Sequence, residues 1–183
     1  AGDEPVYIGF GSMVSGDMGE LAEIIRQAVK LSGVRAVVAL GWGQQEAKTK
    51  DANIFYVKSV PHDWLFPHMA GAVHHGGAGT TATSLRHALP TLVVPFGGDQ
   101  PFWAERVYAA GCGPKAIPRD KLTAENLAEG LRALISNPEY TRNAACIGEA
   151  LRNEHGCANA ADLIEKAVWD WENGNPAQDG MNI

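Results

Sequence analysis

The sequence predicts an α/β fold, a Rossmann-like parallel sheet of about six strands with helices on both faces. Short apolar runs alternate with amphipathic segments along the chain, and glycine-rich turns follow several of these runs. In a parallel sheet, the turns that follow the strands open on one edge, where open α/β sheets bind their ligands. We expect residues 1–173 to form one domain and residues 174–183 to form a loosely held tail.

Short apolar runs mark the expected strands, and most of them end at a glycine, a proline or a polar turn. The strands are expected at residues 5–10, 35–40 and 54–57, at a run that ends with Val73, at 91–94 and, as a short sixth strand, at 115–117. Residues 41–52 are polar and are expected to form a surface loop.

Amphipathic periodicity predicts the helices. In the first helix, apolar residues recur at helical spacing between Leu21 and Val29, and Gly33 ends it. Pro61 and Pro67 leave room for one helical turn between them. Further helices are expected at residues 79–87, 101–110, 124–136, 139–153 and 159–171.

The last expected helix carries an apolar stripe, which predicts that it packs against another surface. The stripe consists of Ile164, Ala167, Val168 and Trp171.

Composition argues against several classes of partner. The net charge is -6, and the 15 Lys and Arg residues form no basic run, so a nucleic-acid partner is not expected. The most apolar run, Val34 to Trp42, is far shorter than the roughly 20 residues of a transmembrane helix. The first ten residues contain no secretory signal pattern, and three cysteines without C-x-x-C spacing fit a reducing compartment. The expected location is therefore cytoplasmic.

A glycine-rich turn, His75 to Thr80, stands where a helix is expected to begin. Unpaired backbone N–H groups and the helix dipole favour an anion at such an end, and glycines let a phosphate approach closely. The sharper hypothesis is a diphosphate site with His75 and the Thr80 hydroxyl as further donors. The alternative is that the glycines only permit close packing and that Thr80 or Thr81 caps the helix. His74 is expected to be a structural histidine.

Two other turns are expected on the same edge. Gly11-Ser12 follows the first strand, and Asp99-Gln100 follows the fifth. A carboxylate beside an amide offers the acceptors and donors needed to bind vicinal hydroxyls, although Asp99 could instead cap the helix before Pro101. His62, after Pro61, is a possible contact to the edge of a base. No acidic cluster or histidine pair has metal-ligand spacing, so no metal site is predicted.

These motifs resemble the C-terminal, donor-binding half of a two-domain glycosyltransferase of the GT-B type, in the family that uses UDP- or TDP-sugars. The resemblance rests on Gly9 to Ser12, Val60 to Leu65, His75 to Thr81 and Pro95 to Gln100, which occur in the family's order. The branches that it resembles most are the sterol 3-beta-glucosyltransferases and the antibiotic glycosyltransferases of actinomycetes.

The resemblance implies a role for each motif. The diphosphate would be bound by Ser12, His75, Gly76, Gly77, Gly79 and Thr80. The uracil or thymine base would meet Val60, Pro61 and His62, and the sugar hydroxyls would meet Asp99 and Gln100.

The resemblance also implies the reaction, a displacement at the anomeric carbon with inversion, without a metal or another cofactor. The acceptor would be lipophilic, such as a sterol or a natural-product aglycone. The catalytic base and the acceptor site would lie in an N-terminal acceptor-binding domain or subunit, so no catalytic residue is expected in this chain. Ser59 and Thr83 replace a Trp and a Glu of the plant members, which leaves the choice between UDP and TDP open.

The sequence leaves two alternatives to a donor domain of a single chain. The chain could be a separate nucleotide-sugar-binding subunit of a split glycosyltransferase that is active only with a partner chain. It could also be a nicotinamide-dependent dehydrogenase, which would carry G-x-G-x-x-G after the first strand. The run Gly9 to Val14 lacks the third glycine, which disfavours the dehydrogenase.

Overall fold

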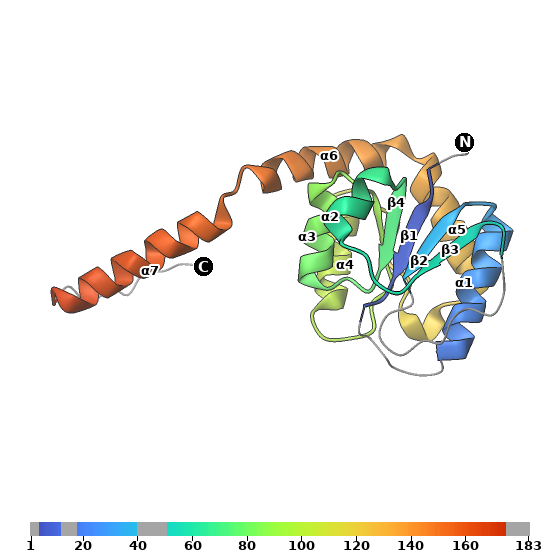
Figure 1. The fold of residues 1–183 in the computed structure, drawn as a ribbon, viewed down its shortest axis with the longest axis horizontal. Coiled ribbons are helices and arrows are strands. Elements are labelled where there is room, and N and C mark those ends of the chain that lie inside the picture. The colour runs from blue at the N-terminus through green and yellow to red at the C-terminus, as the bar shows by residue number, and fades with distance from the viewer. Residues whose placement is uncertain (1–3, 12–17, 40–50, 175–183) are drawn as a thin grey trace. The chain divides into compact units, whose positions relative to one another are not determined.

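The structure, a computed structural model, describes residues 4–11, 18–39 and 51–174. It contains a parallel sheet of five strands in the order β3-β2-β1-β4-β5 (Figure 1). The strands are β1 Val6–Gly9, β2 Ala36–Ala39, β3 Ile54–Val57, β4 Gly71–His74 and β5 Thr91–Val93. The predicted fold class is confirmed.

The strand order changes direction at β1. The chain first proceeds outward to β2 and β3, and then returns to the other side of β1 to form β4 and β5. Gly9 pairs with Ala39 on one side and with His74 on the other, so the ends of these three strands are level. Such a reversal opens a crevice beyond the carboxyl ends of the strands, between β1 and β4.

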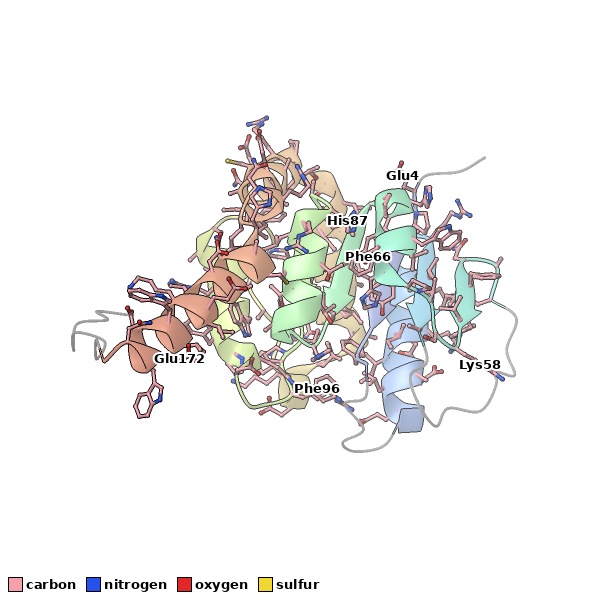
Figure 2. All side chains as sticks on the ribbon, turned by 60° about the vertical axis from the view of Figure 1, so that its left-hand side comes forward. Glu4, Lys58, Phe66, His87, Phe96 and Glu172 are labelled. Carbon is pink, nitrogen blue, oxygen red and sulfur yellow. The ribbon has the colours of Figure 1, made fainter. Side chains whose placement is uncertain are left out.

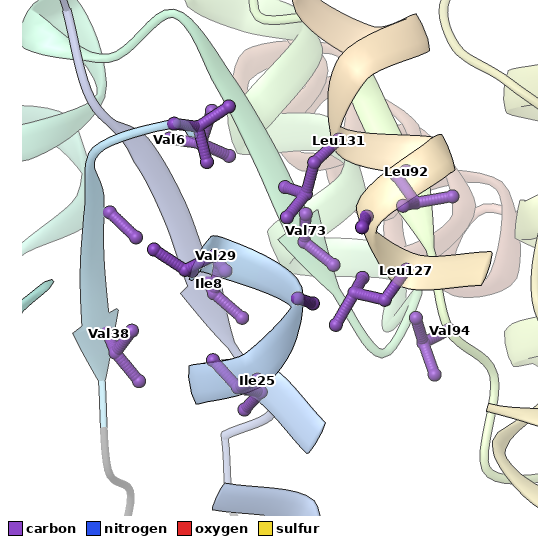
Figure 3. Close-up of a cluster of buried hydrophobic side chains, with 14 of the residues drawn as sticks. Val6, Ile8, Ile25, Val29, Val38, Val73, Leu92, Val94, Leu127 and Leu131 are labelled. Atoms are coloured by element: carbon purple, nitrogen blue, oxygen red, sulfur yellow. The ribbon is translucent and has the colours of Figure 1, made fainter. Parts of the chain in front are cut away.

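One face of the sheet is covered by α1 (Met18–Ser32) and α5 (Ala124–Ser136) (Figure 1). Figure 3 shows Val29 of α1 beside Ile8 of β1, and Leu127 and Leu131 of α5 beside Val73 of β4, all in one buried cluster that also contains Ile25. Burying a side chain of this size contributes roughly 1.5–3 kcal/mol. The Thr123 hydroxyl accepts from the Asn126 N–H, and the Asn126 side chain accepts from the Thr123 N–H, so a capping box fixes the start of α5.

The other face is covered by α2 (His62–Leu65), η1 (Phe66–His68), α3 (Ala78–Arg86) and α4 (Gln100–Ala109) (Figure 1). Two buried clusters lie there. Leu65 and Phe66 pack with Tyr7 of β1, and Val107 of α4 packs with Val93 of β5. Helices therefore cover both faces, as predicted.

The predicted sixth strand is not formed. Residues 115–117 run beside the end of β5, where the Ile117 N–H donates to the Val93 carbonyl at 3.1 Å, but no ladder develops. Pro114 and Pro118 flank the segment, and neither has the N–H that would extend the pairing. The segment continues into η2 (Arg119–Lys121).

The described chain divides into two compact units, one through Leu151 and one from Arg152. Helix α6 (Pro138–Arg152) ends the first unit, and α7 (Gly156–Glu172) occupies the second. No residue of α7 is buried, and Ile164 and Trp171 of the apolar stripe are 65% and 86% exposed. Within its own unit α7 therefore buries no residue of this stripe, and the packing expected of the stripe stays a prediction.

Cys112, Cys146 and Cys157 are free thiols. Among the helices of the described residues, none combines the length and the apolar character needed to cross a membrane.

Candidate functional site

A pocket of about 260 Å³ lies at the carboxyl ends of β1, β2 and β3, beside the start of α3. Its lining includes four of the predicted site residues, namely Val60, His62, His75 and Thr80. In Figure 2, Lys58 and Phe96, which follow β3 and β5, lie toward one end of the sheet, and Glu4 and His87 lie toward the other. The predicted edge of the sheet is therefore the one that carries the pocket.

The turn after β4 has a conformation that requires glycine. Gly76 has a φ of +88°, and a Cβ added there would lie 2.5 Å from Cγ1 of Val93. Gly77 is the N-cap of α3, and no side chain caps the helix. The alternative in which Thr80 or Thr81 caps α3 is therefore not observed.

The start of α3 presents backbone donors. The first helical hydrogen bond runs from the Thr81 N–H to the Gly77 carbonyl at 2.9 Å, so the N–H groups of Ala78, Gly79 and Thr80 have no acceptor within the helix. A Cβ added at Gly79 would meet nothing within 4 Å, so the space above this residue is open. The helix dipole favours an anion at this point by roughly 0.3–1 kcal/mol.

His75 lines the pocket beside these donors. Burial lowers the pKa of its imidazole, and the Asp99 carboxylate partly opposes this by favouring the charged form. His75 is therefore neutral near pH 7 when no ligand is bound. Its Nδ1 is buried and has no hydrogen-bond partner among the described residues.

His74 stabilises the turn through a hydrogen bond to its backbone. It is fully buried, and its Nδ1 accepts from the Gly76 N–H at 3.0 Å. Burial, together with His75 and His62, lowers the pKa of His74 to about 3, so the ring is neutral and carries its hydrogen on Nε2. This Nε2 has no partner among the described residues. The structural role expected of His74 is confirmed, but only one of its nitrogens is satisfied.

The predicted base-binding residues lie where the chain passes from β3 into α2. Val60 and His62 line the pocket, and Pro61 is the exposed N-cap of α2. The His62 ring stacks on Phe66, with centroids 4.5 Å apart and an interplanar angle of 12°. Burial lowers the pKa of His62, which is therefore also neutral near pH 7.

The predicted sugar-binding residues lie in the turn between β5 and α4. Gln100 is only 6% exposed, and its Oε1 accepts from the N–H groups of Phe96 at 2.7 Å and Gly97 at 3.2 Å. Asp99 is exposed and accepts from the Trp103 indole N–H at 2.8 Å. Asp99 makes no side-chain capping bond to α4, so the alternative role of a simple cap is not observed.

The two turns belong to one region, because a Cβ added at Gly76 in the first turn would lie 3.2 Å from the carbonyl oxygen of Gln100 in the second. Asp99 and Gln100 do not line the pocket itself. Ser12, the remaining predicted diphosphate residue, lies outside the described residues. Among the residues that the structure describes, no group of three or more His, Cys, Asp or Glu side chains is placed to share a metal ion.

The pocket also contains residues that sequence reasoning did not assign to the site, among them Tyr7 and Lys58. Tyr7 was interpreted only as part of an apolar strand. The signal was nevertheless present, because alternation along β1 puts Tyr7 on the same face as Gly9, whose lack of a side chain leaves room for a large neighbour.

Comparison with known proteins identifies the family. Residues 23–164 match the model of the erythromycin biosynthesis protein CIII-like, C-terminal domain. A sterol 3-beta-glucosyltransferase of Arabidopsis thaliana is 44% identical over 167 residues, which are 90% of this chain and 27% of that protein. A sterol 3-beta-glucosyltransferase of Cryptococcus neoformans is 39% identical over 173 residues, or 87% of this chain and 11% of that protein.

The fold agrees with this assignment. The solved structure of the calicheamicin glycosyltransferase superposes with a TM-score of 0.77 at 21% identity, over 91% of this chain and 44% of that one. The chain belongs to the family of the CIII-like C-terminal domain, the C-terminal domain of GT-B glycosyltransferases, and is close to sterol 3-beta-glucosyltransferases. It spans about a quarter or less of the sterol glucosyltransferases described above.

Proposed function

We propose that this chain is the donor-binding domain of an inverting, metal-independent glycosyltransferase. The whole enzyme would transfer a hexose from a UDP- or TDP-sugar to a hydroxyl group of a lipophilic acceptor, such as a sterol or a natural-product aglycone. The observation that carries the proposal is the uncapped start of α3 at the switch point of the sheet, beside a pocket that contains His62 and His75. Family membership supports it.

The donor would lie across the carboxyl edge of the sheet. Its diphosphate would accept from the N–H groups at the start of α3 and from His75, with Gly76, Gly77, Gly79 and Thr80 forming the rest of the turn. Ser12, which follows β1 in the sequence, would add a further donor. The base would lie against Val60, Pro61 and His62. The hexose would extend toward the Asp99 carboxylate and Gln100. Because the Oε1 of Gln100 already accepts from two backbone N–H groups of its own loop, only its Nε2 would face a sugar hydroxyl.

The chemistry supplied by this domain would be stabilisation of the leaving group. In the displacement, the acceptor oxygen bonds to the anomeric carbon while the bond from that carbon to the β-phosphate oxygen breaks, and charge accumulates on the departing diphosphate. Fixed N–H dipoles and a histidine that gains a proton stabilise such charge without rearranging. The base that removes the acceptor proton would come from an N-terminal acceptor-binding domain or subunit.

Calorimetric titration tests the donor site directly. We expect UDP, TDP or UDP-glucose to bind the chain, with the same affinity in EDTA as with Mg²⁺. Thr80→Val should weaken binding several-fold, because it removes a donor beside the diphosphate, whereas the control Thr141→Val on α6 should not. If none of the three ligands binds at millimolar concentration, the proposal is wrong.

A separate donor subunit, active only with a partner chain that binds the acceptor, is the second candidate. Expression from the native gene distinguishes the two. A single longer product with transfer activity supports the donor domain of one enzyme, and a short product that requires a co-purifying acceptor subunit supports the split enzyme.

A further inference from the structure

A buried tyrosine contacts the histidine proposed to meet the base. The Tyr7 hydroxyl and Nε2 of His62 are 3.0 Å apart, although the residues are 55 positions apart in the sequence. Tyr7 is 4% exposed, and both residues line the pocket. A Cβ at Gly9 would overlap the Tyr7 hydroxyl, so glycine two residues further along β1 is what allows this contact.

The His62 ring is held on two sides. Phe66, which is fully buried, stacks on one face, and the Tyr7 ring meets His62 edge-on at 5.2 Å and 73°. Tyr7 and Phe66 also contact each other, at 5.2 Å and 60°. Such aromatic pairs contribute beyond the area that they bury, and three mutual contacts fix the plane of the His62 ring.

The hydrogen bond also selects the protonation of His62. Burial raises the pKa of Tyr7 to about 12 and lowers the pKa of His62, so both groups are neutral near pH 7. A buried hydroxyl that donates to no acceptor is costly, and Nε2 of His62 is the acceptor that the described structure places beside it. With Nε2 accepting, the hydrogen of the neutral imidazole is on Nδ1, which leaves Nδ1 as the ring nitrogen open to a ligand.

We propose that Tyr7 is a positioning residue for base recognition: it fixes the ring plane and the tautomer of His62, so that the Nδ1–H donates to a carbonyl oxygen of a pyrimidine base. The inference rests on the proposed function, because it takes the nucleotide end of the donor to lie in this pocket. Both uracil and thymine carry such carbonyl oxygens, so the Tyr7–His62 pair would favour a pyrimidine without distinguishing UDP from TDP.

Tyr7→Phe tests the proposal, because it keeps the ring and removes only the hydroxyl. UDP affinity should fall by roughly 2- to 10-fold, as expected for one hydrogen bond. Affinity for inorganic pyrophosphate, which has no base, should stay unchanged. The matched control is Tyr56→Phe on β3, which β2 separates from β1, and where the side chain packs against the core on the opposite face of the sheet. It should leave both affinities unchanged.

A measurement on the unmodified protein covers the case in which Tyr7→Phe does not fold. Nitrogen-15 spectra of the imidazoles should show His62 with its hydrogen on Nδ1, and in a folded Tyr7→Phe variant this preference should weaken. A hydrogen on Nε2 of His62 in the unmodified protein would overturn the inference, as would equal UDP affinity of the two proteins. If the unmodified protein bound neither UDP nor TDP, the proposed function would fail and the inference with it.

Discussion

The turn after β4 and the turn after β5 look alike in the sequence but offer opposite chemistry. Both follow adjacent parallel strands, contain paired glycines and lead into a helix. In the first turn, the His74 side chain accepts only from the Gly76 N–H, and the N–H groups at the start of α3 have no acceptor within the helix. In the second turn, the Gln100 side chain accepts from the N–H groups of Phe96 and Gly97, and the Asp99 carboxylate is exposed.

The difference shows that the glycine pattern alone does not determine what a turn binds. Glycines permit the tight backbone, with a φ of +88° at Gly76 and +64° at Gly98. The polar side chain that folds back onto the turn then decides which backbone groups remain for a ligand. The first turn suits an anion, whereas the second suits a ligand that brings its own hydroxyl donors.

The largest effect is expected from His74→Leu, which removes the acceptor of the Gly76 N–H. An unpaired buried N–H costs about 1–3 kcal/mol, so the free energy of unfolding should fall by this amount and UDP affinity by roughly 10-fold. Chemical denaturation and calorimetry measure the two quantities. His74→Asn, whose Oδ1 can accept in place of Nδ1, should recover most of both, and failure to recover would contradict the supporting role of His74.

Stability should also depend on pH through His74. Its folded pKa of about 3 lies below the ordinary value of 6.5, so in this window the unfolded chain binds a proton that the folded chain does not. The free energy of unfolding should therefore decrease as the pH falls from 6.5 toward 3. The His74→Asn variant should lose this part of the dependence.

The next effect in size is expected from Gln100→Leu, which leaves the N–H groups of Phe96 and Gly97 without their acceptor. Since these groups are only partly buried, the expected loss of stability is about 1–2 kcal/mol. UDP-glucose should bind several-fold more weakly, whereas UDP should bind almost as before. Gln100→Glu keeps an oxygen acceptor for the two N–H groups and serves as the control for stability. If the affinities for UDP and UDP-glucose fell equally, the turn after β5 would not be specific for the sugar.

A smaller effect is expected from protonation of His75. Burial lowers its pKa in the free protein, and a bound diphosphate would favour the charged form. UDP-glucose should therefore bind more tightly as the pH is lowered from 7.5 to 5.5, with uptake of protons. This donor is preferred to UDP because its diphosphate has no ionisation of its own in that range. His75→Gln should flatten the profile, and an unchanged profile would show that another group titrates.

The smallest effect is expected from Asp99→Asn, because the carboxylate is exposed to water. It should weaken UDP-glucose binding by roughly 2- to 5-fold, at the low end of the net contribution of a single hydrogen bond, because water competes for the exposed carboxylate. UDP binding should stay the same or improve slightly, since a negative charge near the diphosphate is removed. The same loss for both ligands would indicate that Asp99 does not contact the sugar.

Local patterns predicted the local features of this fold. The five strands and the helices follow from short apolar runs and helical periodicity, and the turn after β4 was recognised because glycines precede an amphipathic segment. The sixth strand failed because pairing depends on N–H groups across the sheet, and the flanking prolines Pro114 and Pro118 supply none. The segment 115–117, Lys-Ala-Ile, contains only two apolar residues, and its local pattern does not show whether N–H groups are available for pairing across the sheet.

The parts of the site that were missed depend on contacts between distant segments. Tyr7 and His62 meet only because β1 and α2 are brought together at the centre of the fold. The inward turn of Gln100 depends on the backbone of Gly97 and Gly98, which no periodicity describes. The sequence therefore identifies the turns, whereas the three-dimensional arrangement determines which of their side chains bind the backbone and which are available to a ligand.

A crystal structure of the chain with UDP-glucose tests the central claim most directly, that the turn after β4 binds the diphosphate and the turn after β5 the sugar. We expect the diphosphate oxygens within hydrogen-bonding distance of the N–H groups of Ala78, Gly79 and Thr80, and the hexose hydroxyls at Asp99. A second pocket of about 360 Å³, near Glu4 and Arg35, lies at the amino ends of the strands. A donor bound there, or one with its diphosphate away from α3, would contradict the claim.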